Sequence, residues 1–196
     1  MNISQTKTET MTGVLLAPLD WARSLALVLA FSLLTALAAQ VVIPLPYVPI
    51  TGQTFAVLLT GALLGSRLGA LAMIAYLVEG ASGLPFFQGG NGGAHYLLLS
   101  PTAGYLWSYP AAAFLVGLLA ERGWDRKFLT AAAAMSLGSA LILLCGWAWL
   151  ARLMPPAAAA RVGILPFIGG DIVKIALAAA ALPSGWSILR KTSRRS

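Results

Sequence analysis

Long apolar runs alternate with short polar, proline-rich or glycine-rich segments along most of the chain. A helix that crosses a membrane needs roughly 20 mostly apolar residues, and the runs between Trp21 and Leu189 are of that order or somewhat shorter. They predict about six transmembrane helices and an all-α integral membrane fold. The expected helices cover residues 21–42, 54–64, 70–80, 102–120 and 128–150, with a last one from 166 or 169 to 189.

The segments between these runs predict the connections and the domain plan. Residues 1–20 are expected to form a cytoplasmic or interfacial segment, 21–190 a single membrane domain, and 191–196 a basic cytoplasmic tail. Prolines at positions 44, 46 and 49 exclude a helix there, because each removes an amide donor and restricts the residue before it. Residues 44–49, 81–99 and 152–161 are therefore expected as outer loops, and 65–69 and 121–127 as tight inner turns.

Composition and charge agree with this plan and predict its orientation. Hydrophobic residues make up 59% of the chain, charged residues make up 10%, and the mean hydropathy is +0.82, which excludes an ordinary soluble domain. The net charge is +7, but the basic residues lie at the ends of the apolar runs, so no nucleic-acid partner is expected. Cytoplasmic loops of membrane proteins carry an excess of Lys and Arg. This rule places both termini in the cytoplasm, Arg152 and Arg161 outside, Lys174 within a span, and on the inner side Lys7, Arg23, Arg67, Arg122, Arg126, Lys127, Arg190, Lys191, Arg194 and Arg195.

Two of the outer loops indicate a ligand pocket covered by a lid. Residues 44–49 and 81–99 contain no Lys or Arg and are rich in Pro, Gly and aromatic residues. Irregular backbone at membrane depth is tolerated only where protein buries it or where it lines a cavity. Leu-Pro-Phe followed by a Gly-Gly pair occurs at 84–90 and again at 165–170, and we expect both copies to lie against one ligand. The alternative is that these loops are ordinary linkers.

Asp171 and Lys174 are the most informative residues of the sequence. A charge within a membrane span costs roughly 2.5–3.5 kcal/mol on insertion scales, so such residues are functional candidates by default. At i and i+3 they share a helix face, and we expect them in the first turn of the last helix, where backbone amides are free. Lys174 suits an anionic or carbonyl-bearing ligand, and Asp171 suits a ligand with N–H donors. The alternative is a structural ion pair or a helix cap.

Further ligand-binding candidates lie in the outer loops and next to them: Tyr47, Thr51, Gln53, Phe87, Gly89, Gly90, Asn91, His95 and Tyr105. His95 is the only histidine, so no metal site is expected. The sequence has no G-x-x-x-x-G-K-[ST] phosphate loop and no H-E-x-x-H motif. It also offers no evident nucleophile–base set. We therefore expect neither an enzyme nor a cofactor.

Small residues recur at every fourth position of the first helix, at Ala22, Ala26 and Ala30 and again at Ser32 and Ala36. Such spacing lets another helix approach closely. Internal packing and a partner subunit explain it equally well.

Loop motifs in a fixed order carry a family resemblance. Residues 44–54 (PLPYVPITGQT), 80–87 (GASGLPFF), 89–90 (GG) and 100–106 (SPTAGYL) resemble the BioY family, the biotin-binding S components of energy-coupling-factor (ECF) transporters. The resemblance implies an S-component fold of six helices, with an outward-facing biotin site under the loop that follows helix one. It implies that Asp171, Lys174 and Asn91 match polar positions of the family. Ser100 and Ala103 stand where the usual pattern has Gly, and His95 is not a general family feature.

The resemblance also implies partners and a location. The partners would be a transmembrane coupling subunit and two ABC-type ATPases, which dock on small residues of helix one, with Ser32 and Ala36 the best match. The chain would capture biotin with high affinity in the bacterial inner membrane. Two alternatives stay open: a biotin carrier that works without ATPases, alone or as a homo-oligomer, and an S component for another small vitamin. An intramembrane enzyme and a channel are disfavoured.

Overall fold

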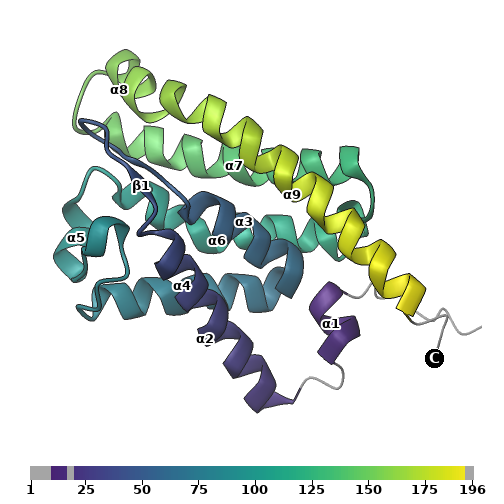
Figure 1. Ribbon diagram of the computed structural model, residues 1–196. Helices are drawn as coiled ribbons and strands as arrows, with labels where there is room; N and C mark the ends of the chain where they lie inside the picture. Colours follow the sequence, from purple (N-terminus) through teal and green to yellow (C-terminus); the bar gives the residue numbers. More distant parts are fainter. Residues whose placement is uncertain (1–9, 17–19, 193–196) are drawn as a thin grey trace, which may run out of the picture.

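The computed structural model describes residues 10–16 and 20–192, and its described part is almost entirely helical (Figure 1). The segments expected at 1–9 and 193–196 lie outside the described residues. The principal helices are α2 (Trp21–Ala38), α3 (Gln53–Leu64), α4 (Ser66–Ala81), α6 (Ala103–Ala120), α7 (Phe128–Leu150) and α9 (Leu165–Thr192). Shorter elements connect them: α1 (Met11–Leu16), β1 (Val42–Ile43), β2 (Ile50–Thr51), η1 (Gln88–Gly90), α5 (Ala94–Leu99), η2 (Trp124–Arg126) and α8 (Pro156–Gly163).

Four helical stretches of the described residues are long and apolar enough to cross a membrane: Trp21–Ala38, Ala103–Ala120, Phe128–Leu150 and Pro156–Ile188. Helices α3 and α4, with 12 and 16 residues, are shorter than a usual span. The chain is therefore a multi-pass helical membrane protein. The count of six spans and the cytoplasmic placement of the termini stay predictions.

Helix α6 lies at the centre of the bundle, where it packs against α3, α4 and α7. Glycine allows one of these contacts: a Cβ atom on Gly61 of α3 would lie 2.4 Å from the carbonyl oxygen of Ala113 on α6. Small residues let membrane helices pack with their backbones close together. By contrast, α2 lies at the edge of the bundle and packs mainly against α4 (Figure 1).

The connection between α2 and α3, residues 41–52, is called the lid below. Its ends pair as a short antiparallel ladder, with Val42 opposite Thr51 and Ile43 opposite Ile50. β-Branched residues favour extended pairing, and the prolines between the two strands exclude a helix. This ladder was not predicted, and it ends α2 at Ala38 rather than near residue 42. The expected all-α fold thus needs a small correction.

The last third of the chain also differs from the expectation. The predicted outer loop at 152–161 contains α8, with Pro156 at its first position, where proline is tolerated because that amide is unpaired in any helix. Helix α9 begins at Leu165, before both positions that the sequence suggested. The predicted start near Pro166 is confirmed to within one residue, because proline fits the first turn of a helix, whereas the alternative start near Gly169 was wrong.

Candidate ligand-binding site

A small cavity lies between the lid, α3, α5, α6 and α9. Its volume is about 20 Å³, which is enough for about one water molecule. Pockets for small organic ligands usually measure about 300–1,000 Å³, so a larger ligand enters only if the lining moves. The lining residues come from five parts of the chain: Val48, Pro49 and Thr51 of the lid; Gln53 and Thr54; Gln88 and Tyr96; Thr102, Tyr105, Leu106 and Tyr109; and Phe167 and Lys174.

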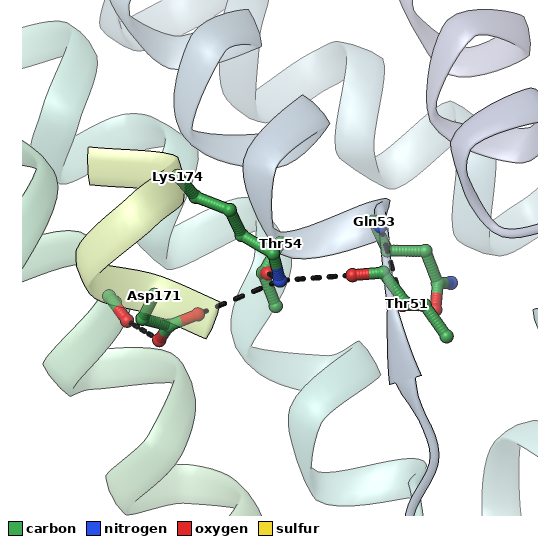
Figure 2. A network of polar contacts seen from close by, with 6 residues as sticks. Thr51, Gln53, Thr54, Asp171 and Lys174 are labelled. Carbon is green, nitrogen blue, oxygen red and sulfur yellow. Dashed lines mark hydrogen bonds and ion pairs between the residues drawn. The ribbon is translucent and has the colours of Figure 1, made fainter. Parts of the chain in front are cut away.

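Lys174 connects α9 to the lid (Figure 2). Its Nζ donates a hydrogen bond to the carbonyl oxygen of Thr51 at 3.0 Å and another to Thr54 Oγ1 at 2.8 Å. It also forms an ion pair with Asp171 Oδ1 at 3.6 Å. The other carboxylate oxygen, Asp171 Oδ2, accepts a short hydrogen bond from the hydroxyl of Ser139 on α7. These contacts keep a buried acid and a half-buried base satisfied in an apolar environment.

A second polar network connects the lid to the glycine-rich outer loop. Thr51 Oγ1 donates to Gln53 Oε1 at 2.9 Å, and Gln53 Nε2 donates to the hydroxyl of Tyr76 at 2.5 Å. That hydroxyl in turn donates to the carbonyl oxygen of Phe86 at 3.0 Å. The side-chain amide of Gln53 therefore has both its donor and its acceptor ends engaged within the chain.

Aromatic rings form much of the remaining wall. Tyr105 stacks on Phe167 with ring centroids 5.9 Å apart, and its hydroxyl donates to the carbonyl oxygen of Gly163 at 2.7 Å. Tyr109 stacks on Tyr76, with centroids 6.3 Å apart. A cavity with apolar rings and a few convergent polar groups suits a small ligand that has an apolar body and polar ends.

Comparison with known proteins places the chain in a family. A sequence model of the BioY family matches residues 5–191. This chain belongs to the BioY family. The expected resemblance is thus confirmed.

Two BioY-family relatives cover most of the chain. "Probable biotin transporter BioY" from Pyrococcus horikoshii is 42% identical over 157 residues, which is 80% of this chain and 92% of the relative. "Biotin transporter BioY" from Thermotoga maritima is 37% identical over 150 residues, or 76% and 87% of the two chains. The fold resembles the crystal structure of the S-component for biotin from an ECF-type ABC transporter. That match has a TM-score of 0.75 and 26% identity, and it covers 87% of this chain and 92% of the other.

The cavity of this BioY-family chain brings together only some of the candidate ligand-binding residues. Thr51, Gln53, Tyr105 and Lys174 line it, and Asp171 lies directly behind Lys174. All but Tyr105 belong to the two polar networks described above, which contact the lid at Thr51.

The remaining candidates lie outside the lining. Tyr47 is 54% exposed at the tip of the lid, and His95 is exposed on α5. Asn91 is exposed and donates to the carbonyl oxygen of Gln88 at 2.7 Å, so its local contact orders the glycine-rich loop. Phe87 is fully buried behind the cavity, where it stacks on Tyr96. Gly89 and Gly90 are exposed with positive φ and shape the same loop.

The structure adds lining residues that the sequence did not reveal, among them Gln88, Tyr96, Tyr109 and Phe167. Tyr109 follows Tyr105 by four positions on one helix, so the pair shares a helix face, and this signal was available. Gln88 belongs to the first copy of the repeated Leu-Pro-Phe pattern, at 84–90, and Phe167 belongs to the second, at 165–170. Both copies thus reach the cavity, although their glycine pairs do not line it.

Two expectations need correction. Because α9 begins at Leu165, Asp171 lies in its second turn, and the backbone amides around it belong to the helix interior rather than being free. Ser32 and Ala36 are 1% and 4% exposed. Ser32 donates a short hydrogen bond to Glu79 on α4, so this face of α2 is buried within the chain. The other two docking candidates, Ala26 and Ala30, are exposed.

Proposed function

We propose that this BioY-family chain is the biotin-binding S component of an ECF-type biotin uptake transporter. The observation that carries the proposal is the cavity under the lid, whose lining includes Lys174, ion-paired with Asp171 at 3.6 Å. Relatives that are 42% and 37% identical over most of the chain, named biotin transporters, support the choice of ligand. Membership in a family with such relatives also agrees with a transport role rather than an enzymatic one.

The chemistry of the cavity matches the parts of biotin. The ligand has a ureido group with two N–H donors and a carbonyl, an apolar ring and chain, and a carboxylate. Lys174 and Asp171 supply one charge of each sign, and the stacked Tyr105 and Phe167 supply an apolar wall. A site with buried polar groups matched to a ligand rejects analogues that leave those groups unpaired. This favours biotin over other small vitamins.

Biotin entry requires the lid to move, because about 20 Å³ cannot hold a bicyclic ligand with a side chain. Val48 and Pro49 of the lid line the cavity, and Lys174 contacts the carbonyl oxygen of Thr51 at the inner end of the lid. In this proposal the contact between α9 and the lid opens and closes with the ligand.

We place the chain in the bacterial inner membrane with both termini in the cytoplasm and the lid outside. The support is the distribution of basic residues, of which Arg152 and Arg161 lie on the proposed outer side. The six principal helices would all cross the membrane, with the short α3 and α4 completed by the lid and the glycine-rich loop. Residues 21–190 would form the membrane domain, preceded by a cytoplasmic or interfacial segment and followed by the basic tail.

The chain has no phosphate-binding loop of its own, so energised uptake needs partners. We propose a transmembrane coupling subunit and two ABC-type ATPases. Of the small residues on helix α2, Ala22, Ala26 and Ala30 are exposed and form a stripe on which another helix can pack. Biotin uptake by cells that lack the coupling subunit and the ATPases would instead support a self-sufficient carrier, alone or as a homo-oligomer.

The test is calorimetry of the purified chain in detergent with biotin, thiamine and riboflavin. Tight binding of biotin alone is expected. Selective binding of another vitamin would transfer the proposal to that ligand. Failure of well-folded protein to bind any of the three would contradict a vitamin-capture role.

A further inference from the structure

Two exposed arginines lie at the end of the bundle that carries the lid. Arg152 lies in the turn after α7, and Arg161 lies in the last turn of α8. Helix α8 and the lid lie at the same end of the molecule (Figure 1). Within residues 10–16 and 20–192, these are the two exposed cations of that end, because the third basic residue there, Lys174, is half-buried.

Arg152 is connected to the cavity wall through Trp149. Its guanidinium group lies over the indole ring, 4.9 Å from the ring centroid, and such a contact attracts a cation to the ring face. Trp149 Nε1 donates to the carbonyl oxygen of Ser100 at 3.0 Å. The Ser100 hydroxyl lies 2.9 Å from Thr102 Oγ1, and Thr102 lines the cavity. Arg152 is therefore positioned beside the wall while its charge stays exposed.

Arg161 lies close to another part of the same wall. Two residues later, the carbonyl oxygen of Gly163 accepts a hydrogen bond from Tyr105, which lines the cavity. A Cβ atom on Gly163 would lie 2.6 Å from the Tyr105 hydroxyl oxygen, so the end of α8 packs directly on this ring. Phe167 stacks on the same ring from the first turn of α9. The exposed charge of Arg161 is thus held next to the cavity by the fold of α8.

No exposed acidic side chain opposes these charges at this end of the described chain. Glu79, near the end of α4, is half-buried and accepts a short hydrogen bond from Ser32. Asp171 is buried and ion-paired with Lys174. A positive potential at an opening with low-dielectric walls raises the local concentration of anions and their rate of association. Positive charge here continues from the two surface arginines to Lys174 in the cavity lining.

We propose that Arg152 and Arg161 attract the carboxylate of biotin toward the cavity and so accelerate its capture; this rests on the proposed function. Neither arginine belongs to the cavity lining of the described residues, so they act on the approaching ligand rather than on the bound one. Charges at the rim of a binding site change mainly the association rate and its salt dependence. The dissociation rate of biotin should therefore be almost independent of them.

The test measures association and dissociation of radiolabelled biotin with the full chain, purified in a neutral detergent. At about 10 mM salt, where charges interact over roughly 30 Å, Arg152→Gln with Arg161→Gln should lower the association rate about three- to tenfold. At about 1 M salt, where this range is roughly 3 Å, the loss should disappear. The dissociation rate should stay the same. Biotinamide, in which a neutral amide replaces the carboxylate, should associate equally fast with both proteins.

Two further double variants separate charge from packing. Arg152→Lys with Arg161→Lys keeps both charges and should restore fast association. Arg122→Gln with Lys127→Gln removes two exposed charges from the opposite end of the bundle and should leave the association rate unchanged.

Three results would overturn the role of the two arginines while the unsubstituted chain binds biotin normally. They are an unchanged association rate in the first variant at low salt, equal slowing of biotin and biotinamide, and equal slowing in the glutamine and lysine variants. Failure of the unsubstituted chain to bind biotin would instead overturn the proposed function, and this proposal with it.

Discussion

Lys174 of α9 donates a hydrogen bond to the carbonyl oxygen of Thr51, although the two residues are 123 positions apart in the chain. Thr51 ends β2, the second strand of the lid, so the last helix holds the loop that covers the cavity. The same ammonium group is ion-paired with Asp171, which Ser139 of α7 holds through a hydrogen bond. A charge change at this point therefore affects both the lining of the cavity and the closure of the lid.

Removal of the Lys174 ammonium should weaken biotin binding strongly. Hydrogen bonds to charged groups contribute about 1.5–3 kcal/mol, so Lys174→Ala is expected to lower affinity roughly ten- to a hundredfold in calorimetry. Asp171→Asn should act in the same direction, because it removes the counter-charge of Lys174. Lys127→Ala, an exposed cation at the start of α7, is the control and should bind normally. Unchanged affinity in both site variants would refute the assignment of the site.

Ser139 should stabilise the ion pair of Asp171 with Lys174 through its hydrogen bond to the Asp171 carboxylate. Its substitution by Ala leaves Asp171 Oδ2 without this donor in a buried position, and an unpaired buried acceptor costs about 1–3 kcal/mol. We expect Ser139→Ala to lower the free energy of unfolding in detergent by about that amount and to weaken biotin binding as well. Ser136→Ala removes an exposed hydroxyl from the same helix and should change neither quantity. Equal effects of the two substitutions would contradict the role of Ser139.

Close packing of α3 on α6 should tolerate no side chain at Gly61. A Cβ atom there would lie 2.4 Å from a backbone oxygen, which can move only with its helix, so Gly61→Ala should destabilise the protein by about 1–3 kcal/mol. Gly169 on α9 has open space around it, so Gly169→Ala should be neutral or stabilise by up to about 1 kcal/mol through helix propensity. Thermal unfolding in detergent measures both. A stabilising effect at Gly61 would mean that the two helices are further apart.

Asp125 should make stability depend on pH. It lies in η2, between the spans, and is 2% exposed. Burial raises the pKa of its carboxyl group, and the hydrogen bond from Trp186 and the charge of Arg126 only partly oppose this. The native state therefore holds the proton more tightly than the unfolded state. The contribution of Asp125 to the free energy of unfolding therefore falls as the pH rises from the ordinary carboxyl pKa to the raised one. Above the raised pKa this contribution is constant.

The measurement for Asp125 is the free energy of unfolding as a function of pH for the unsubstituted chain and for Asp125→Asn. The amide cannot ionise and still offers an oxygen to the Trp186 indole. The variant should lose this part of the pH dependence and be relatively more stable above the window. Parallel pH curves for the two proteins would show that Asp125 has the same pKa folded and unfolded.

Several features of the fold follow from residues read one segment at a time. The proline-rich lid and the tight turn at Gly65, where φ is +85°, are local consequences of proline and glycine geometry. The start of the last helix was predicted near either Pro166 or Gly169, and only the structure distinguished the two, because it places the Gly-Gly pair inside α9. The ladder in the lid was missed because two-residue strands leave no periodic pattern to detect.

The sequence by itself determined that this is a multi-pass membrane protein of the BioY family, because apolar length, charge distribution and ordered loop motifs are properties of single segments. It also singled out Asp171 and Lys174, since a charge in an apolar run is conspicuous without any neighbour. Only the tertiary structure decided what these residues contact and that Ser32 and Ala36 face inward. A contact such as that of Lys174 with Thr51 depends on how distant helices pack, and no local pattern encodes that.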